Sequence, residues 1–284
     1  MTERQSVFLD TDIFGDPDDL FALIYLLGQA EIALEAVMTV DELKQLRARV
    51  LQGLFVQLNL SVSVFSGKDI GDGKYFVFEE SQAEYLEPTS SFLSLIREKL
   101  AQAADRTTYL SIGPLTNLAE LLDQLREQAS QLKIIVMGGS FQPQFGRAEH
   151  NIRLDIPAAQ RVALRSGIYW ITADNSVSSK LQISQDHWWI QELNAQPGIL
   201  AEILKQNVGR FHSRFYPNSY LHDPLVVSAA LGKHMTFESK KVRLSDEGYF
   251  VEDETGVEHF FVKTIDYEGF LEDFRKAVMS KLKA

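Results

Sequence analysis

Five aspartates lie close together at the point where an apolar strand is predicted to give way to a helix. They belong to the run Asp10-Thr11-Asp12-Ile13-Phe14-Gly15-Asp16-Pro17-Asp18-Asp19. Carboxylates at this density repel one another, and a fold that gathers them usually binds a cation there. Because the run follows a strand, its side chains fall at the strand's carboxyl end, where open α/β folds place their ligands. The run therefore predicts an α/β fold with a metal site at one edge of its sheet.

The residues around the aspartates carry the signals of a short strand and a helix. Val7–Leu9 is an apolar stretch typical of a buried strand. Asp16 is predicted to cap the helix, with Pro17 at its first position and Gly28 after its end. The helix dipole accounts for acidic residues in the first turn, but not for Asp10 and those on the strand side.

Composition excludes several classes of protein. Hydrophobic residues make up 45% and charged residues 24% of the 284 positions, which is ordinary for a soluble globular protein with a large core. The net charge of −11 argues against nucleic acid or an anionic membrane as a partner. The absence of cysteine excludes disulfides and thiolate chemistry. Because residues 1–6 carry no apolar signal-peptide core, we expect cytoplasmic residence.

Strand and helix patterns alternate along the chain without a linker, so we expect one domain over residues 1–284. The pattern predicts an open, mostly parallel sheet with helices on both faces. Further strands are predicted at Leu34–Val40, Ser61–Phe65, Thr108–Ile112, Ile134–Met137 and Tyr169–Thr172. Helices are predicted up to Leu54, at Ser91–Ala103, Asn117–Arg126 and Ala158–Arg165, after Pro224, and at Tyr267–Leu282. A small antiparallel hairpin region is predicted from Val242–Leu244, Tyr249–Glu252 and Phe260–Thr264.

Three long polar connections are also predicted: Ser66–Ser90, Ser140–Asn151 and Asn207–Leu221. Long connections in a compact domain are usually functional or mobile. The last of them is rich in aromatic and basic side chains. Two interpretations stay open for it: a lid that stacks on a planar group, or a surface at an oligomer interface.

Four further segments, each weak alone, give the aspartate run a context. They are Gly113-Pro114-Leu115-Thr116-Asn117, Met137-Gly138-Gly139, Ala148-Glu149-His150-Asn151 and Leu221-His222-Asp223-Pro224. In this order, from Val7 to the last helix, they resemble the inosine–uridine-preferring nucleoside hydrolase family. The resemblance implies a Rossmann-like fold, a bound Ca²⁺ and hydrolysis of the N-glycosidic bond of a ribonucleoside or related riboside. It also implies a homo-oligomer, either a dimer or a tetramer.

The resemblance implies roles for individual residues of this chain. The Ca²⁺ ligands it implies are Asp12, Asp19, Asp223 and the main-chain oxygen of Thr116. Asp12 is also implied to act in catalysis, together with His222, which the family places near the leaving base. The implied substrate-binding residues are Asp18, Met137, Glu149 and Asn151, and Asp10 is implied to support Asp12 from behind.

The chain departs from the family pattern where the family contacts ribose and base. Thr39-Val40-Asp41-Glu42 and Gln142-Pro143-Gln144 stand where Gly-Asn pairs are expected. His150 replaces a phenylalanine, and Gly71-Asp72-Gly73-Lys74 is a remnant of a longer motif. The metal residues are thus intact, while the substrate contacts are partly rewritten.

Two other functions stay open at this point. The first is a non-catalytic relative that keeps Ca²⁺ and binds a ribosyl ligand, which the missing asparagines favour and the presence of Asp12 and His222 disfavours. The second is a phosphatase like the haloacid dehalogenases, with Asp10 as nucleophile and Mg²⁺ as cofactor. It leaves Thr116 and Asp223 without a role.

Overall fold

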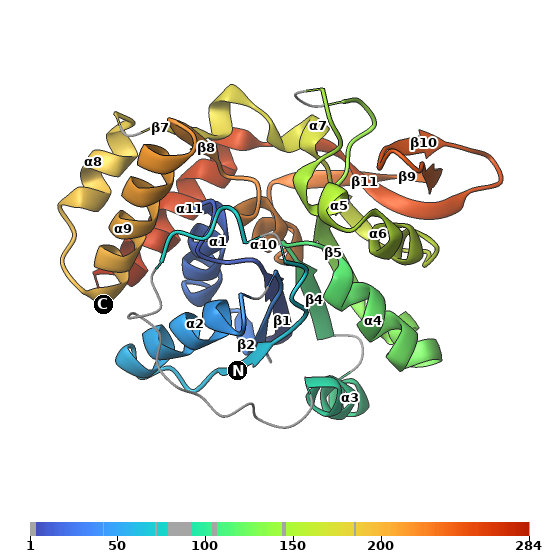
Figure 1. Cartoon of the computed structure of the whole chain (residues 1–284), viewed down its shortest axis with the longest axis horizontal. Coiled ribbons are helices and arrows are strands. Elements are labelled where there is room, and N and C mark those ends of the chain that lie inside the picture. The colour runs from blue at the N-terminus through green and yellow to red at the C-terminus, as the bar shows by residue number, and fades with distance from the viewer. Residues whose placement is uncertain are drawn as a thin grey trace.

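A nine-stranded sheet runs through the computed structural model, which describes residues 4–41, 43–71, 73–78, 92–103, 107–143, 146–184 and 186–283 (Figure 1). Its order is β10-β9-β11-β6-β5-β4-β1-β2-β3, and β7 and β8 form a separate pair. The strands are β1 (Gln5–Thr11), β2 (Ile32–Thr39), β3 (Ser63–Ser66), β4 (Thr107–Ser111), β5 (Lys133–Met137), β6 (Tyr169–Ile171), β7 (Gln182–Ser184), β8 (Asn218–Tyr220), β9 (Met235–Leu244), β10 (Phe250–Glu252) and β11 (Val257–Ile265).

The sheet is parallel from β3 across to β11, and β9 and β10 add an antiparallel edge. The predicted open, mostly parallel sheet is therefore confirmed. The predicted antiparallel hairpin region near the C-terminus is confirmed, because β9 pairs antiparallel with both β10 and β11. Since β11 also pairs with β6 in parallel, these last strands extend the main sheet.

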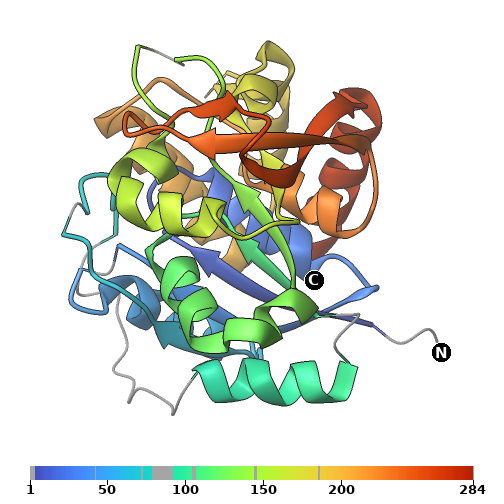
Figure 2. The same ribbon diagram turned by 90° about the vertical axis from the view of Figure 1, so that its right-hand side faces the viewer.

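Helices cover both faces of the sheet, as predicted. They are α1 (Asp18–Leu27), α2 (Leu46–Gln57), α3 (Phe92–Ala103), α4 (Thr116–Leu125), α5 (His150–Leu154), α6 (Ile156–Ala163), α7 (Ala173–Ser176), α8 (Trp188–Asn194), α9 (Ile199–Arg214), α10 (Pro224–Ala230) and α11 (Tyr267–Leu282). Val7 and Leu9 of β1 join a core with α1, α2 and α8 to α11, whereas Phe8 joins a second core with α3, α4 and α6. Figure 2 shows the helices packed on the two sides of the sheet. The alternation follows from the strand's period of two residues.

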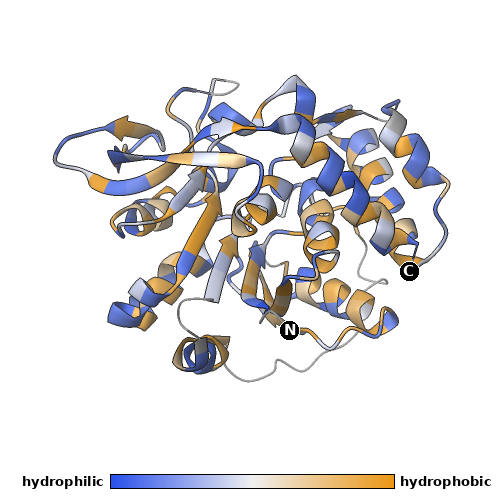
Figure 3. Ribbon diagram, turned by 180° about the vertical axis from the view of Figure 1, so that it is seen from behind, coloured by the Kyte–Doolittle hydropathy of each residue, from blue (hydrophilic) through white to orange (hydrophobic). Residues whose placement is uncertain are grey.

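The edge strands are less apolar than the centre of the sheet. β5 is buried along nearly its whole length, whereas β9 alternates between exposed and partly buried side chains. Figure 3 shows this contrast, with hydrophobic central strands and a mixed arm at the β9 edge. No helix in the described parts of the chain is both long and apolar enough to span a bilayer.

Strand register brings several chain turns to one place. Thr11 of β1 pairs with Thr39 of β2, and Asp10 pairs with Ser111 of β4. Parallel strands in this register end at the same edge, so the residues that follow β1, β2 and β4 are neighbours. This is the edge at which the aspartate run begins.

Two local predictions are wrong. Helix α1 begins at Asp18, its N-cap position is Pro17, and no side chain caps it, so Asp16 is not the cap. The segment Asn207–Leu221 is not a long connection, because α9 continues to Arg214 and β8 follows. Gly28 does end α1, as predicted. Of Ser66–Ser90, residues 72 and 79–90 lie outside the described parts of the chain.

Gly139 offers a test of how tightly β5 is packed against the β10 edge. Its φ is +76°, and an added Cβ would lie 2.4 Å from the Phe250 ring. We expect Gly139→Ala to lower the free energy of unfolding by about 2–5 kcal/mol, combining backbone strain with overpacking. Gly167→Ala is the matched control, because its φ is +81° but nothing lies within 4 Å.

The control should cost only the backbone contribution, about 1–2 kcal/mol. Urea unfolding of both variants measures the difference. Equal losses would show that Phe250 moves aside without cost.

Candidate active site

A cavity lies at the carboxyl edge of the sheet and is lined by residues that follow or end β1, β4 and β5. Figure 1 shows these three strands side by side. The cavity collects side chains from segments far apart in the sequence. Its lining consists of Asp12, Gly15, Asp16, Asp18, Asp19, Tyr75, Ile112, Met137, Glu149, His150, Asn151, His222 and Asp223. The structure thus brings together most of the residues that the sequence singled out.

Three buried carboxylates form the floor of this cavity. Asp18 and Asp19 occupy the first turn of α1, and Asp223 immediately precedes α10. Each of the three offers an oxygen within 4.8 Å of the others. Burial first, and then mutual repulsion, raises the pKa of all three carboxyls well above the usual range. A set of buried carboxylate oxygens under such repulsion fits a hard divalent cation, which would neutralise it.

Asp12 lies beside this cluster and not within it. Its charge contributes to the raised pKa of Asp18, Asp19 and Asp223, so it is close enough to repel each of them. Its side chain is 15% exposed, and its Oδ2 lies 4.0 Å from Nε2 of His150. Of these four carboxylates, Asp12 therefore lies where it can contact both a cation bound at the floor and a ligand above the floor.

Asp10 lies behind the floor and is fully buried. Its carboxylate accepts hydrogen bonds from Nδ2 of Asn117 at 2.8 Å and from the hydroxyl of Tyr109 at 2.9 Å. Burial raises the pKa of Asp10 to about 7, against the effect of these two donors. Since Asp10 does not line the cavity, it has no access to a substrate. This placement counts against the phosphatase hypothesis, which needs Asp10 as nucleophile.

A buried arginine that the sequence did not single out holds the turn after β1. The Arg47 side chain is 1% exposed and forms a 3.0 Å ion pair with Asp41. Its guanidinium also donates to the main-chain oxygens of Asp12 and Ile13. Arg47 thus fixes the backbone that presents Asp12. No local signal marks this role, because α2 places Arg47 beside the turn only in the folded chain.

Glu149 and Asn151 stabilise the upper wall of the cavity. The Glu149 carboxylate accepts from the main-chain N–H groups of Gly139, Asn151 and Ile152 at 2.9–3.1 Å, and it caps α5. Asn151 Nδ2 donates to the carbonyls of Ile112 and Met137 at 3.0 and 3.1 Å. These bonds tie α5 to the ends of β4 and β5.

His222 is buried beside Asp223 in the wall of the cavity. Burial lowers its pKa to about 4, so the imidazole is neutral at pH 7. Its Nδ1 has no hydrogen-bond partner among the described residues. The Tyr220 ring lies 5.4 Å away, centre to centre. A neutral His222 can offer one ring nitrogen to a ligand, as a hydrogen-bond donor or acceptor.

Thr116, a predicted ligand, does not line the cavity. It is the first residue of α4, and its hydroxyl donates to Asp155 at 2.6 Å. Main-chain carbonyls in the first turn of a helix point along the axis and away from the strand end. Ile112 lines the cavity instead, directly after β4. Ile112, four residues before Thr116, is therefore the residue of this segment that lines the cavity.

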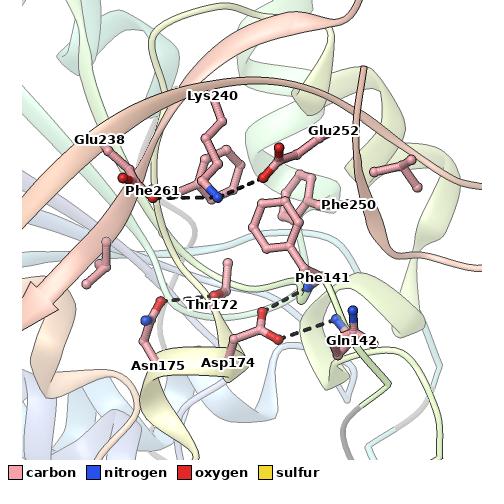
Figure 4. Close-up of a pocket in the computed structure, with 12 residues that line it drawn as sticks. Phe141, Gln142, Thr172, Asp174, Asn175, Glu238, Lys240, Phe250, Glu252 and Phe261 are labelled. Carbon is pink, nitrogen blue, oxygen red and sulfur yellow. Dashed lines mark hydrogen bonds and ion pairs between the residues drawn. The ribbon is translucent and has the colours of Figure 1, made fainter. Parts of the chain in front are cut away.

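A second cavity, of about 590 Å³, lies behind the loop 140–149 (Figure 4). Phe141, Phe250 and Phe261 line it, and Lys240 lies between Glu238 and Glu252. The Asp174 carboxylate accepts from the main-chain N–H groups of Phe141 and Gln142 at 2.8 and 3.3 Å. These bonds fix one end of the loop 140–149, and Glu149 fixes the other.

A sequence model of the inosine-uridine preferring nucleoside hydrolases matches residues 7–272. Among curated proteins, uridine nucleosidase 1 of Arabidopsis thaliana is 29% identical over 61% of this chain and 51% of its own length. The non-specific ribonucleoside hydrolase RihC of Escherichia fergusonii is 28% identical over 65% of this chain and 66% of its own. The chain thus spans about half to two thirds of these relatives.

Solved structures share the fold over nearly the whole chain. A purine-preferring ribonucleoside hydrolase from Gardnerella vaginalis superimposes with a TM-score of 0.81 at 20% identity, covering 98% of this chain and 99% of that one. An inosine-uridine preferring nucleoside hydrolase from Bacillus anthracis gives 0.75 at 19% identity, covering 97% and 99%. At these identities the likeness concerns the fold.

The raised pKa values predict how the stability of metal-free protein depends on pH. An unfolded aspartate loses its proton near pH 4, whereas Asp10 and Asp16 keep theirs in the folded state up to about pH 7. Between these values the folded state binds more protons, so the free energy of unfolding falls as pH rises. The expected slope is about 1.4 kcal/mol per pH unit for each such group.

Urea unfolding in a chelator at pH 5, 6 and 7 measures this slope. Asp18→Asn is the informative variant, because it removes one charge from the cluster and should flatten the curve. Stability that rises from pH 5 to 7 would contradict the prediction.

Proposed function

The chain belongs to the inosine-uridine preferring nucleoside hydrolase family, and from that premise we propose that it hydrolyses the N-glycosidic bond of a ribonucleoside or related riboside. The products are ribose and the free base, and the proposed cofactor is Ca²⁺. The observation that carries this proposal is the buried cluster of Asp18, Asp19 and Asp223 with Asp12 at its side. Relatives named as a uridine nucleosidase and a non-specific ribonucleoside hydrolase support a ribonucleoside substrate without selecting its base.

We propose that Asp12, Asp19 and Asp223 hold the cation, as the resemblance implies, with the Ile112 carbonyl in place of Thr116. The three carboxylates lie at the same strand edge as Ile112, which also lines the cavity. Asp18 lies within the carboxylate cluster, so it can serve the cation and a ribose hydroxyl together. When bound, Ca²⁺ would be coordinated by the two oxygens of a ribose diol and would act as a Lewis acid that polarises water.

The residues of the chain perform the remaining steps of the proposed reaction. Asp12 accepts the proton of the attacking water while that oxygen bonds to the anomeric carbon. The bond from that carbon to the base nitrogen breaks, and the surrounding carboxylates stabilise the positive charge that develops on the sugar. Because His222 is neutral at pH 7, its proposed role is a hydrogen bond to the departing base, which takes its proton from solvent or a neighbouring donor.

Glu149, Asn151 and Met137 are proposed to hold the ribose. All three line the same cavity as the floor carboxylates. Their hydrogen bonds to the ends of β4 and β5 keep this wall rigid. A single domain over residues 1–284, cytoplasmic residence and assembly into a dimer or tetramer stay predictions from the sequence.

The first test is release of ribose from a panel of purine and pyrimidine nucleosides, with Ca²⁺ or with chelator. Asp12→Asn keeps the shape of the side chain but removes the base, so we expect kcat to fall by about 10²–10⁴-fold. Asp123→Asn is the matched control, because Asp123 is exposed and pairs with Arg161 away from the cavity. No release from any nucleoside, with cation still bound, would favour the non-catalytic ribosyl-binding alternative.

The metal prediction has its own readout, which is independent of turnover. Because protons and a cation compete for the same carboxylates, we expect Ca²⁺ affinity to rise from pH 5 to pH 7.5. Isothermal titration calorimetry with Ca²⁺ measures this, and Asp19→Asn should weaken binding by at least about tenfold. Affinity that does not change with pH, or with this variant, would place the cation elsewhere.

A further inference from the structure

Two basic side chains lie beside Tyr75, a residue of the cavity lining, and form no ion pair with a carboxylate among the described residues; they mark the rim of the cavity. Among the described residues, neither Lys74 nor Arg147 takes part in an ion pair, and both side chains are exposed. The Lys74 ammonium lies 5.0 Å from the centre of the Tyr75 ring, and Tyr75 itself lines the cavity. In a chain with a net charge of −11, basic side chains beside a cavity that form no ion pair among the described residues are available to a ligand.

Arg147 is part of a polar junction between three separate segments. Its guanidinium interacts with the hydroxyl groups of Tyr75 and Tyr216, which raise its pKa and lie 3.0 Å from each other. Tyr75 follows β3, Arg147 precedes α5, and Tyr216 follows α9. A guanidinium can only donate, so the tyrosine oxygens accept from Arg147, and one hydroxyl proton forms the hydrogen bond between the two tyrosines. The second hydroxyl proton and the other guanidinium N–H groups are then free to donate to a ligand.

The loop that carries Arg147 is held at both ends. Asp174 binds the main chain at Phe141 and Gln142, as Figure 4 shows, and Glu149 caps α5 two residues after Arg147. The Arg147 guanidinium is therefore presented from an anchored loop. The ring of His150 adds an edge contact with Tyr75 at 5.6 Å, centre to centre.

The cavity is thus polarised, with carboxylates on its floor and cations on its rim. A cation on the floor accounts for the carboxylates, but a neutral ribonucleoside makes no use of Lys74 and Arg147. A ligand with an oxyanion at the end away from the floor uses both ends of the cavity. Guanidinium bonds to phosphate or carboxylate are among the strongest hydrogen bonds in proteins.

We propose that Arg147 and Lys74 form an anion subsite and that the preferred substrate is a riboside bearing an oxyanion group. This inference rests on the proposed function for the ribosyl end of the ligand. The oxyanion has two chemical sources, a phosphate on the ribose 5′-oxygen or a carboxylate on the base. The residues concerned are outside the floor, so they select the substrate and do not touch the reacting bond.

The test compares three ligands by isothermal titration calorimetry with Ca²⁺-loaded protein. Uridine is neutral, uridine 5′-monophosphate carries the phosphate, and orotidine carries a carboxylate on its base. We expect one of the two anionic ligands to bind at least about tenfold more tightly than uridine, since hydrogen bonds to charged groups are the stronger ones. The one that does so identifies the source of the oxyanion.

Two variants of Arg147 separate charge from a merely structural contact. Arg147→Lys keeps the charge, whereas Arg147→Gln keeps a donor for the tyrosine hydroxyls but removes the charge. We expect Gln to weaken the anionic ligand by about 10- to 100-fold while uridine changes by less than about twofold, and Lys to keep most of the preference. Arg161→Ala removes a remote exposed charge and should change neither ligand.

Anionic ligands that bind no more tightly than uridine would overturn the inference, as would equal losses for both kinds of ligand in Arg147→Gln. Ribose release from the same ligands decides the proposed function separately. Turnover of uridine without any preference for an anion contradicts only the subsite. A preference that Arg147 controls, without release of ribose from any ligand, contradicts only the hydrolase.

Discussion

Mutual repulsion among buried carboxylates is the constraint on which the rest of this structure depends. Asp18, Asp19 and Asp223 offer oxygens within 4.8 Å of one another, and each residue is at most 5% exposed. Burying an unpaired charge costs several kcal/mol, so the fold must surround the cluster with compensating groups. The Thr11 hydroxyl, which donates to Asp19, and the Arg47 guanidinium both lower the pKa of Asp19, and Arg47 also holds the carbonyls of Asp12 and Ile13.

Asn117 extends this set of compensating contacts from the carboxylates into the sheet. Its amide donates to Asp10 and to the Thr39 carbonyl, and its oxygen accepts from the Lys68 main chain at 2.8 Å. One side chain thereby joins the turns after β1, β2 and β3. The crowding around Gly67, where an added Cβ would lie 2.3 Å from the Thr39 oxygen, shows how closely these turns approach. A floor built this way is rigid before any ligand arrives.

The sequence predicted those features that local patterns encode. Apolar runs predicted the central strands, and the aspartate run predicted the place of the carboxylates. Prediction from the sequence failed where the three-dimensional placement of a residue decides its role. Helix α9 has an apolar stripe that consists of Leu204, Val208 and Phe211. The aromatic and basic residues of the same segment nevertheless suggested a loop. Which carbonyl faces the cavity, at Ile112 or Thr116, depends on the chain turn at Gly113. No pattern links Arg47 or Arg147 to their distant partners.

Floor and rim are built from different parts of the fold, and this separation lets them act on different ends of a ligand. The floor follows from strand ends and helix starts, whereas the rim comes from segments after β3, before α5 and after α9. Without a cation, the raised pKa values of Asp18, Asp19 and Asp223 let protons neutralise the floor. A divalent cation takes over this role by displacing those protons. In either state the negative charge of the floor is compensated locally, so the charges of Arg147 and Lys74 are left to select the ligand.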